Sequence, residues 1–132
     1  MEELIQDYEE KKLFERLVEY YKKIYPEIPI EKSEIILSPK DIEEVYYTYP
    51  GIEEEATFNE KVERVKKAIP YGYDTPVILL KKGNKLILLD GHRRLKAAMD
   101  LGIEWKALVI EVPEDVSIGI EKMVKGKIKE VF

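Results

Sequence analysis

The 132-residue sequence contains no cysteine, a single histidine, and no apolar run near the roughly 20 residues that a membrane-spanning helix needs. Without cysteine, the chain has no disulfide, no thiolate metal centre and no cysteine nucleophile. One histidine excludes a multi-histidine metal site within one chain. One glutamine and two asparagines accompany abundant Lys and Glu, a composition typical of hyperthermophile proteins. No secretory signal pattern opens the chain, so we expect a cytoplasmic protein without a membrane partner.

Acidic residues exceed basic ones, 27 to 22, but they are unevenly distributed. Residues 1–66 hold 10 basic and 18 acidic side chains, a net charge of −8, whereas residues 67–132 hold 12 and 9, a net charge of +3. Affinity for nucleic acid rests largely on neutralising phosphates. The overall charge of −5 therefore disfavours a general DNA or RNA binder, although a local basic pocket in the second half is allowed.

The spacing of apolar residues predicts a mixed α/β chain of one domain. Helices are expected over 2–25, 38–49, 57–69, 92–101 and 116–128, and strands over 34–37, 77–80, 86–89 and 107–112. Ser38-Pro39 resembles a helix start, and Thr57–Glu60 has the pattern of a capping box. We expect a small mixed sheet flanked by helices. Within the single domain 1–132, we predict an N-terminal helical extension over 1–30, a core over 31–112 and a C-terminal helix over 113–132.

The segment with the most chemical information is 86–102, where an apolar strand runs through Asp90-Gly91 directly into a helix. A helix N-terminus offers unpaired backbone N–H groups and a partial positive charge. His92, Arg93 and Arg94 add basic side chains there, which oppose the helix dipole unless an anion binds. The pattern indicates a phosphate-sized site with Arg93 or Arg94 as a bidentate clamp. The alternative is a solvated first turn.

Residues 90–98, Asp-Gly-His-Arg-Arg-Leu-Lys-Ala-Ala, with Leu101-Gly102 after them, resemble a signature of the ParB/sulfiredoxin superfamily. The helix at 59–69, the turn at Gly72 and the strand Pro76-Val-Ile-Leu-Leu resemble the earlier part of the same pattern, so the resemblance spans roughly 35–112. It implies a ParB/sulfiredoxin-like fold in which this box grips nucleotide phosphates.

The branches of that superfamily differ in what they imply. Sulfiredoxins need a cysteine in the box, so their activity is excluded. Chromosome-partitioning ParB proteins usually have Glu where His92 stands, and they continue into a DNA-binding domain; about 20 residues follow the last expected strand here. The Asp-Gly-His-Arg form is closer to archaeal free-serine kinases. That resemblance implies an NTPase or small-molecule kinase with a carboxylate base among Glu53, Glu54 and Glu55; we favour Glu54 or Glu55.

The resemblance and the residues together suggest a role for each candidate. Backbone N–H groups of Gly91–Arg93, with the side chains of His92, Arg93 and Arg94, would hold the phosphates of ATP, ADP or CTP. Thr75 would be a further phosphate contact. Asp90 would hold Mg²⁺ or orient a small hydroxyl substrate, with Glu54, Glu55 and His92 in catalytic roles.

These roles have structural alternatives. The glutamates would otherwise form an exposed acidic loop, and Asp90 would be a capping turn residue. Tyr71 and Tyr73 are candidates to stack on a purine.

Three function classes therefore stay open. The first is a nucleotide-dependent enzyme, the second a ParB-like DNA-binding or nuclease module, and the third a regulator that senses a nucleotide without chemistry. The N-terminal helix would either cover the sheet or pair with a second copy in a homodimer.

Overall fold

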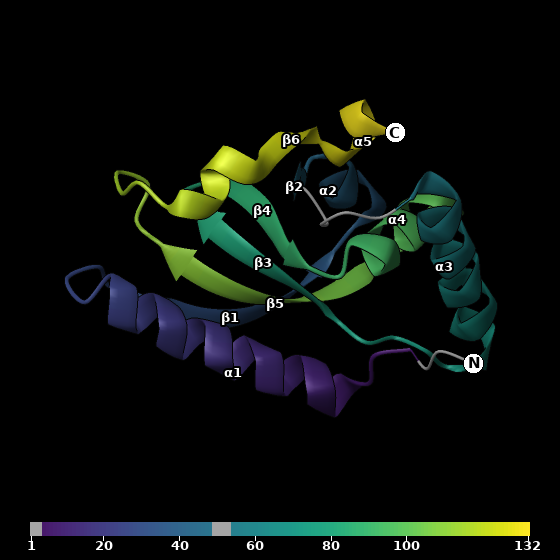
Figure 1. Ribbon diagram of the computed structural model, residues 1–132, viewed down its shortest axis with the longest axis horizontal. Coiled ribbons are helices and arrows are strands. Elements are labelled where there is room, and N and C mark those ends of the chain that lie inside the picture. The colour runs from purple at the N-terminus through teal and green to yellow at the C-terminus, as the bar shows by residue number, and fades with distance from the viewer. Residues whose placement is uncertain (1–3, 49–53) are drawn as a thin grey trace.

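The computed structural model describes residues 4–48 and 54–132, and in them a mixed sheet packs between helices (Figure 1). The elements are α1 (Asp7–Ile24), β1 (Glu31–Leu37), α2 (Pro39–Glu43), β2 (Tyr46–Thr48), α3 (Glu55–Ala68), η1 (Ile69–Tyr71), β3 (Val77–Lys82), β4 (Lys85–Asp90), α4 (His92–Leu101), β5 (Trp105–Val112), η2 (Gly119–Met123), β6 (Val124–Lys127) and α5 (Ile128–Val131). The expected mixed α/β class is confirmed.

The six strands follow the order β1-β5-β3-β4-β2-β6. The β3–β4 hairpin is antiparallel, as the turn residues 82–85 predict, and parallel pairings flank it, β3 with β5 and β4 with β2. The two outermost strands pair antiparallel with their neighbours, β1 with β5 at one edge and β6 with β2 at the other. The centre of the sheet is thus β3 and β4, and the chain leaves β4 directly into α4.

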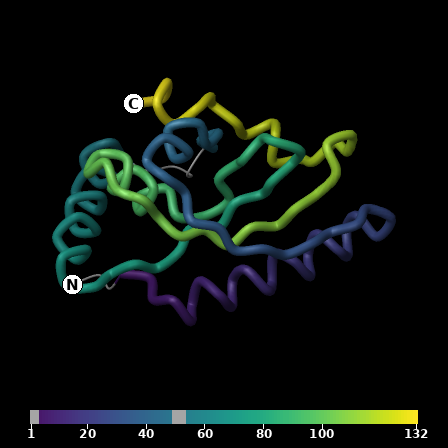
Figure 2. The backbone as a smooth tube through the Cα atoms, turned by 180° about the vertical axis from the view of Figure 1, so that it is seen from behind, coloured from purple at the N-terminus to yellow at the C-terminus, as the bar shows by residue number. Residues whose placement is uncertain are grey.

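Successive residues of β3 enter two different hydrophobic cores, one on each face of the sheet. Val77 and Leu79 pack with α2, α3 and α4, whereas Ile78 and Leu80 pack with α1 and the segment around Ile118. Strands buried on both faces read as continuous apolar runs, which is why 77–80 shows no alternation in the sequence. Figure 2 shows α1 running beside β1 while α3 and α4 lie together at one end of the sheet.

Helix α1 is part of this packing. Phe14, Val18 and Tyr21 form its buried stripe and fill one of the two cores. Its start is stabilised by a reciprocal cap, in which the backbone N–H of Gln6 donates to Glu9 at 3.1 Å. The helix therefore covers the sheet, which is one of the two roles expected for it.

Two of the expected helices differ in the structure. The Ser38 cap is confirmed, since its hydroxyl accepts from the backbone N–H of Asp41 at 3.0 Å. The helix ends at Glu43 instead of Tyr49, because the β-branched and aromatic residues that follow form β2. Helix α3 begins at Glu55 with Glu54 as its N-cap, so the capping box expected at Thr57–Glu60 is wrong.

The C-terminal helix expected over 113–132 is also wrong. Residues 119–123 form the short helix η2, then Val124–Lys127 pair with β2 as the edge strand β6, and only Ile128–Val131 are α-helical. The apolar residues spaced for one helical face instead serve both cores: Ile128 lies in one, and the other is contacted by Val116, Ile120 and Val124. In the described ranges 4–48 and 54–132, no helix is long and apolar enough to cross a membrane.

The junction between β4 and α4 depends on Gly91. Its φ of 101° lies in the region that side chains disfavour, and an added Cβ would come within 2.6 Å of Val77 Cγ1 and 3.2 Å of the Val77 Cα. Glycine at this position therefore lets the turn pack directly on β3. Gly102, which ends α4 with a φ of 65°, has no such neighbour within 4 Å.

We predict that Gly91→Ala lowers the free energy of unfolding by about 3 kcal/mol or more, since strain and a backbone-level clash add together. The control Gly102→Ala carries the conformational strain alone and should cost about 1 kcal/mol. Urea unfolding of both variants measures the difference. Equal losses would show that contact with Val77 does not constrain the turn.

Candidate functional site

The strand-to-helix turn at 90–94 has the form expected of a phosphate site. Helix α4 begins after Gly91, which has no side chain to cap the free N–H groups, and its first turn contains no acidic residue. His92 and Arg93 are half-buried there. The first-turn amides and the positive end of the helix dipole remain favourable for an anion. This placement agrees with the role expected for Gly91–Arg93, and the role itself stays a prediction.

Arg94 is placed differently from the expected phosphate clamp, because its side chain is buried inside the protein. Its Nη1 donates to the carbonyl of Pro76 at 2.6 Å and lies 2.7 Å from Glu10 Oε2. Its Nη2 donates to Asp90 Oδ2 at 3.1 Å. With 4% of its surface exposed, the guanidinium joins α1, the segment before β3, and the end of β4. Of the two adjacent arginines, Arg93 is therefore the candidate phosphate ligand.

Glu10 of α1 has no exposed surface, and sequence reasoning missed it. Burial raises the pKa of its carboxyl well above the usual range; the neighbouring Asp90 carboxyl raises it further, and Arg94 opposes the shift. This shift favours the protonated, uncharged form of Glu10 at neutral pH. The signal in the sequence was the position: Glu10, Phe14 and Val18 recur four residues apart on the buried stripe of α1.

His92 is held in one tautomer by Thr48. The Thr48 hydroxyl donates to the Leu88 carbonyl at 2.7 Å, and its oxygen lies 2.8 Å from His92 Nε2. Because the hydroxyl has one proton and gives it to Leu88, Nε2 carries the ring hydrogen and Nδ1 is the acceptor. Burial lowers the pKa of His92 to about 4, and the Arg93 and Arg94 charges also lower it, against an opposing effect of Asp90. In the unliganded protein this shift favours the neutral imidazole at pH 7, with Nε2 as the hydrogen-bond donor.

An aromatic cluster links the start of α4 to the start of α3. Tyr47 donates from its hydroxyl to the His92 carbonyl at 3.0 Å, and its ring meets those of His92 and Phe132 edge to face. Phe132 in turn stacks on Phe58 of α3. Glu54 and Glu55 begin that same helix with exposed side chains, while Glu53 lies outside the described residues.

Thr75 and Tyr73 bind the N-terminal segment. Both hydroxyls donate to the carbonyl of Ile5 at 2.9 Å, and Trp105 Nε1 donates to the Thr75 carbonyl at 2.9 Å. Thr75 is therefore a buried anchor for the entry to α1, which corrects its expected role as a phosphate contact. Tyr71 is 92% exposed, so it alone of the two tyrosines remains free to stack on a base.

The carboxylates around the turn do not fit a magnesium ion held by the protein. Asp90 Oδ2 accepts a hydrogen bond from Arg94 Nη2, and the guanidinium balances its charge. Within residues 4–48 and 54–132, no three His, Asp or Glu side chains gather closely enough to hold a metal ion. The residues present therefore do not fit a magnesium site at Asp90.

Comparison with known proteins gave one significant match among curated sequences. It is an uncharacterized protein of Methanocaldococcus jannaschii, 31% identical over 114 residues that make up 84% of this chain. The match spans only 39% of the length of that protein. No family profile matches the sequence, and no solved structure is a significant match.

We predict that Glu10→Gln is nearly neutral, whereas Glu10→Ala lowers the free energy of unfolding by roughly 3 kcal/mol. Glutamine keeps an acceptor for Arg94 and a donor for Asp90, as the protonated acid does, while alanine leaves a cavity beside a buried charge. Urea unfolding at pH 7 measures both, with Glu19→Gln on the exposed face of α1 as the control. An equally severe loss in Glu10→Gln would show that the ionised carboxylate is required.

We further predict that His92 makes the protein less stable in mild acid. Its folded pKa of about 4 lies below the usual 6.5, so the unfolded chain binds the proton more readily between these values. The contribution is complete above pH 6.5 and falls by about 2 kcal/mol between pH 7.5 and 5. Comparing wild type with His92→Gln separates the contribution of His92 to this pH dependence from the contribution of the carboxylates. Because His92 is the chain's sole histidine, its NMR titration also reads the pKa directly; a value near 6.5 contradicts the burial.

Proposed function

We propose that this chain binds the phosphates of a nucleoside di- or triphosphate at the turn from β4 to α4, as an NTPase or small-molecule kinase. One observation supports the proposal most strongly: α4 starts on an uncapped glycine with a positive φ, and its first turn has basic residues and no acidic residue. This is the arrangement that favours an anion and has no advantage for an isolated helix. The resemblance of residues 90–98 to the ParB/sulfiredoxin box points to the same ligand.

The contacts described above refine which residues would act. Backbone N–H groups of Gly91–Arg93 and the Arg93 guanidinium would bind the phosphates, whereas Arg94 and Asp90 would hold the turn in place from inside the protein. Phosphoryl transfer depends mainly on such positioning and on charge neutralisation. The proposed site thus has a ligand-binding outer layer and a buried supporting layer.

The acceptor side of the reaction would involve His92, Glu54 and Glu55. The unprotonated Nδ1 of His92 can accept a hydrogen bond from a substrate hydroxyl and so orient it. A ring nitrogen whose pKa is about 4 is a weak base at neutral pH. The stronger candidates to take the hydroxyl proton are therefore the exposed glutamates at the start of α3.

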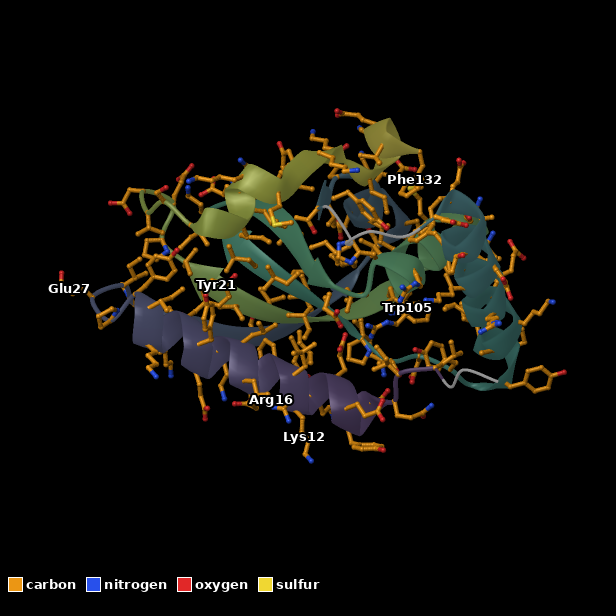
Figure 3. All side chains as sticks on the ribbon, viewed as in Figure 1. Lys12, Arg16, Tyr21, Glu27, Trp105 and Phe132 are labelled. Atoms are coloured by element: carbon orange, nitrogen blue, oxygen red, sulfur yellow. The ribbon has the colours of Figure 1, made fainter. Side chains whose placement is uncertain are left out.

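The test is binding of ATP, ADP and CTP, each with and without Mg²⁺, to wild type and Arg93→Ala. A ligand of the folded state raises the melting temperature, so we expect a rise with at least one nucleotide and a dissociation constant at least tenfold weaker in Arg93→Ala. The control is Arg16→Ala, because Arg16 is exposed on α1, away from the turn (Figure 3).

Two outcomes would contradict the proposal. The first is no response to any nucleotide at millimolar concentration. The second is an equal response in Arg93→Ala and wild type, which would place the ligand elsewhere. A short DNA duplex belongs in the same series, since a shift with DNA alone, steeply dependent on salt, would favour the nucleic-acid class instead.

A further inference from the structure

Strand β1 is an open edge of the sheet. In the part of the chain that the structure describes, it pairs with β5 and with no other strand, and its seven residues keep one register without a bulge. It contains no proline, which would remove a backbone donor from the edge, although Lys32 and its acidic neighbours place charges there. Backbone N–H and C=O groups along its outer side are thus arranged to accept another strand.

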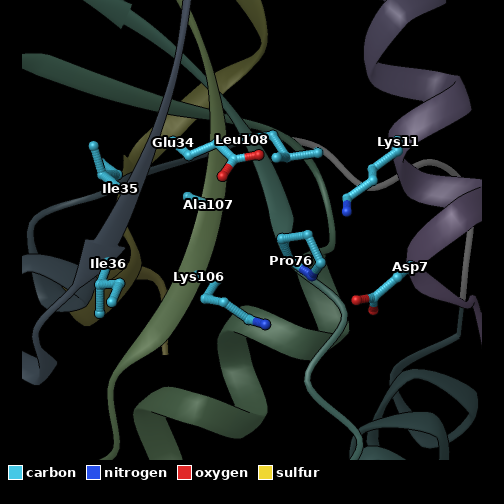
Figure 4. Close-up of a pocket in the computed structure, with 9 residues that line it drawn as sticks. All are labelled: Asp7, Lys11, Glu34, Ile35, Ile36, Pro76, Lys106, Ala107 and Leu108. Atoms are coloured by element: carbon cyan, nitrogen blue, oxygen red, sulfur yellow. The ribbon is translucent and has the colours of Figure 1, made fainter.

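The face of β1 that points toward α1 is covered at Lys32, which contacts Glu15 of α1, and open at the other end of the strand. Ile36 on that face is 62% exposed. Helix α1 packs over β3 and β5 more than over β1, which leaves a groove of about 350 Å³ between the helix and the edge strand (Figure 4). Asp7 and Lys11 line its helix side, and Glu34 and Ile36 line its strand side. An exposed isoleucine beside an open edge is the kind of surface that natural sheets usually protect.

We propose that β1 pairs with β1 of a second copy of this chain, antiparallel and centred on Ser33, to form a continuous sheet across a homodimer. In this register, Lys32 lies opposite Glu34 of the second copy, and Glu34 opposite its Lys32. The exposed Ile36 lies opposite Ile30, the residue just before the strand, which is partly buried against the core under α1. On this face, the opposed pairs along the interface are therefore isoleucine with isoleucine at both ends and lysine with glutamate twice between them. The surface is thus complementary to its own copy.

The charges select this register over its neighbours. A two-fold axis between antiparallel strands is perpendicular to the sheet, so it must pass through a pair of identical residues. Centred on Lys32, the pairing opposes two lysines, and centred on Glu34 it opposes two glutamates; like charges directly opposite are destabilising. Centred on Ile35, it opposes no unlike charges and sets Glu34 against Ile36. The pairing centred on Ser33 also sets one charge, Glu31, against Ile35, but it gains two pairs of unlike charges. Ser33 is the centre that opposes unlike charges.

The rest of the fold leaves room for this pairing. Both copies of α1 would lie on the same face of the joined sheet, and each is set back from the edge because its contacts are mainly with β3 and β5. Lys32 lies 3.3 Å from Glu15 of α1, but both side chains are about half exposed, so the lysine can also reach across the interface. A single strand pair buries less area than a standard stable interface, which makes the expected dimer a micromolar one.

Cross-linking through an introduced cysteine tests the register directly, because the chain has no cysteine of its own. In Ser33→Cys, the two sulfurs meet at the axis, within the short Cα separation that a disulfide needs. Mild oxidation should give a covalent dimer at least tenfold faster than for Glu31→Cys, whose two copies lie far apart in this register. A mixture of Glu31→Cys and Ile35→Cys should cross-link to each other faster than either does alone. Equal rates for all single variants would indicate random collision and overturn the proposal.

A charge exchange tests the same pairing in solution. By sedimentation from micromolar to millimolar concentration, Glu34→Lys should weaken the dimer at least tenfold, as should Lys32→Glu. The double exchange Lys32→Glu/Glu34→Lys should restore it to within about threefold of wild type. Glu130→Lys, beside β6 at the opposite edge of the sheet, is the control of equal charge. A monomer at every concentration, or a dimer that none of these changes weakens, would overturn the proposal, and neither outcome bears on the nucleotide site.

Discussion

The buried guanidinium of Arg94 is the interaction on which the rest of this structure depends. It connects three parts of the chain that are distant in sequence: Glu10 in α1, the carbonyl of Pro76 before β3, and Asp90 at the end of β4. A buried charge is tolerated only when it is paired and hydrogen-bonded. Each of these partners must therefore be in place before the guanidinium can leave water, which fixes where α1 and α4 lie relative to the sheet.

The same cluster gives the outer turn its shape. Gly91 packs against Val77, one residue after the Pro76 whose carbonyl Arg94 binds. His92 is fixed from the other side by Thr48 and Tyr47 of β2. The first turn of α4 is thus held by buried contacts on both sides, and its backbone amides are pre-organised instead of being ordered by a ligand. Binding an anion there would therefore cost the backbone of the turn little conformational entropy.

The elements predicted best from sequence were those with local signals. The bounds of α4 follow from Asp90-Gly91 before it and Gly102 after it, and the Ser38 cap follows from Ser-Pro-Lys-Asp. The strands β2 and β6 were missed, because each is short and is defined by partners more than 40 residues away along the chain. Their residues had the spacing of a helix, and only the tertiary pairing decided otherwise.

At the candidate site, the sequence was enough to predict the turn, but not which of its side chains are buried and which face solvent. Arg93 and Arg94 are adjacent and chemically identical, and which one turns inward depends on how α4 packs, information that lies in α1 and β3. Glu10 could not be recognised because a glutamate on an amphipathic helix is usually solvated. Its partner is 84 residues away.

The two hydrophobic cores lie on opposite faces of the sheet, and by themselves they would allow α1 to detach while the other face stayed packed. The Glu10–Arg94 contact ties α1 to α4, so detachment of the helix would remove one of the partners of the buried guanidinium. Breathing of α1 is therefore coupled to fraying at the start of α4. Slow amide exchange in α1 and at the turn from β4 to α4 should rise and fall together, as one cooperative unit that spans the sheet.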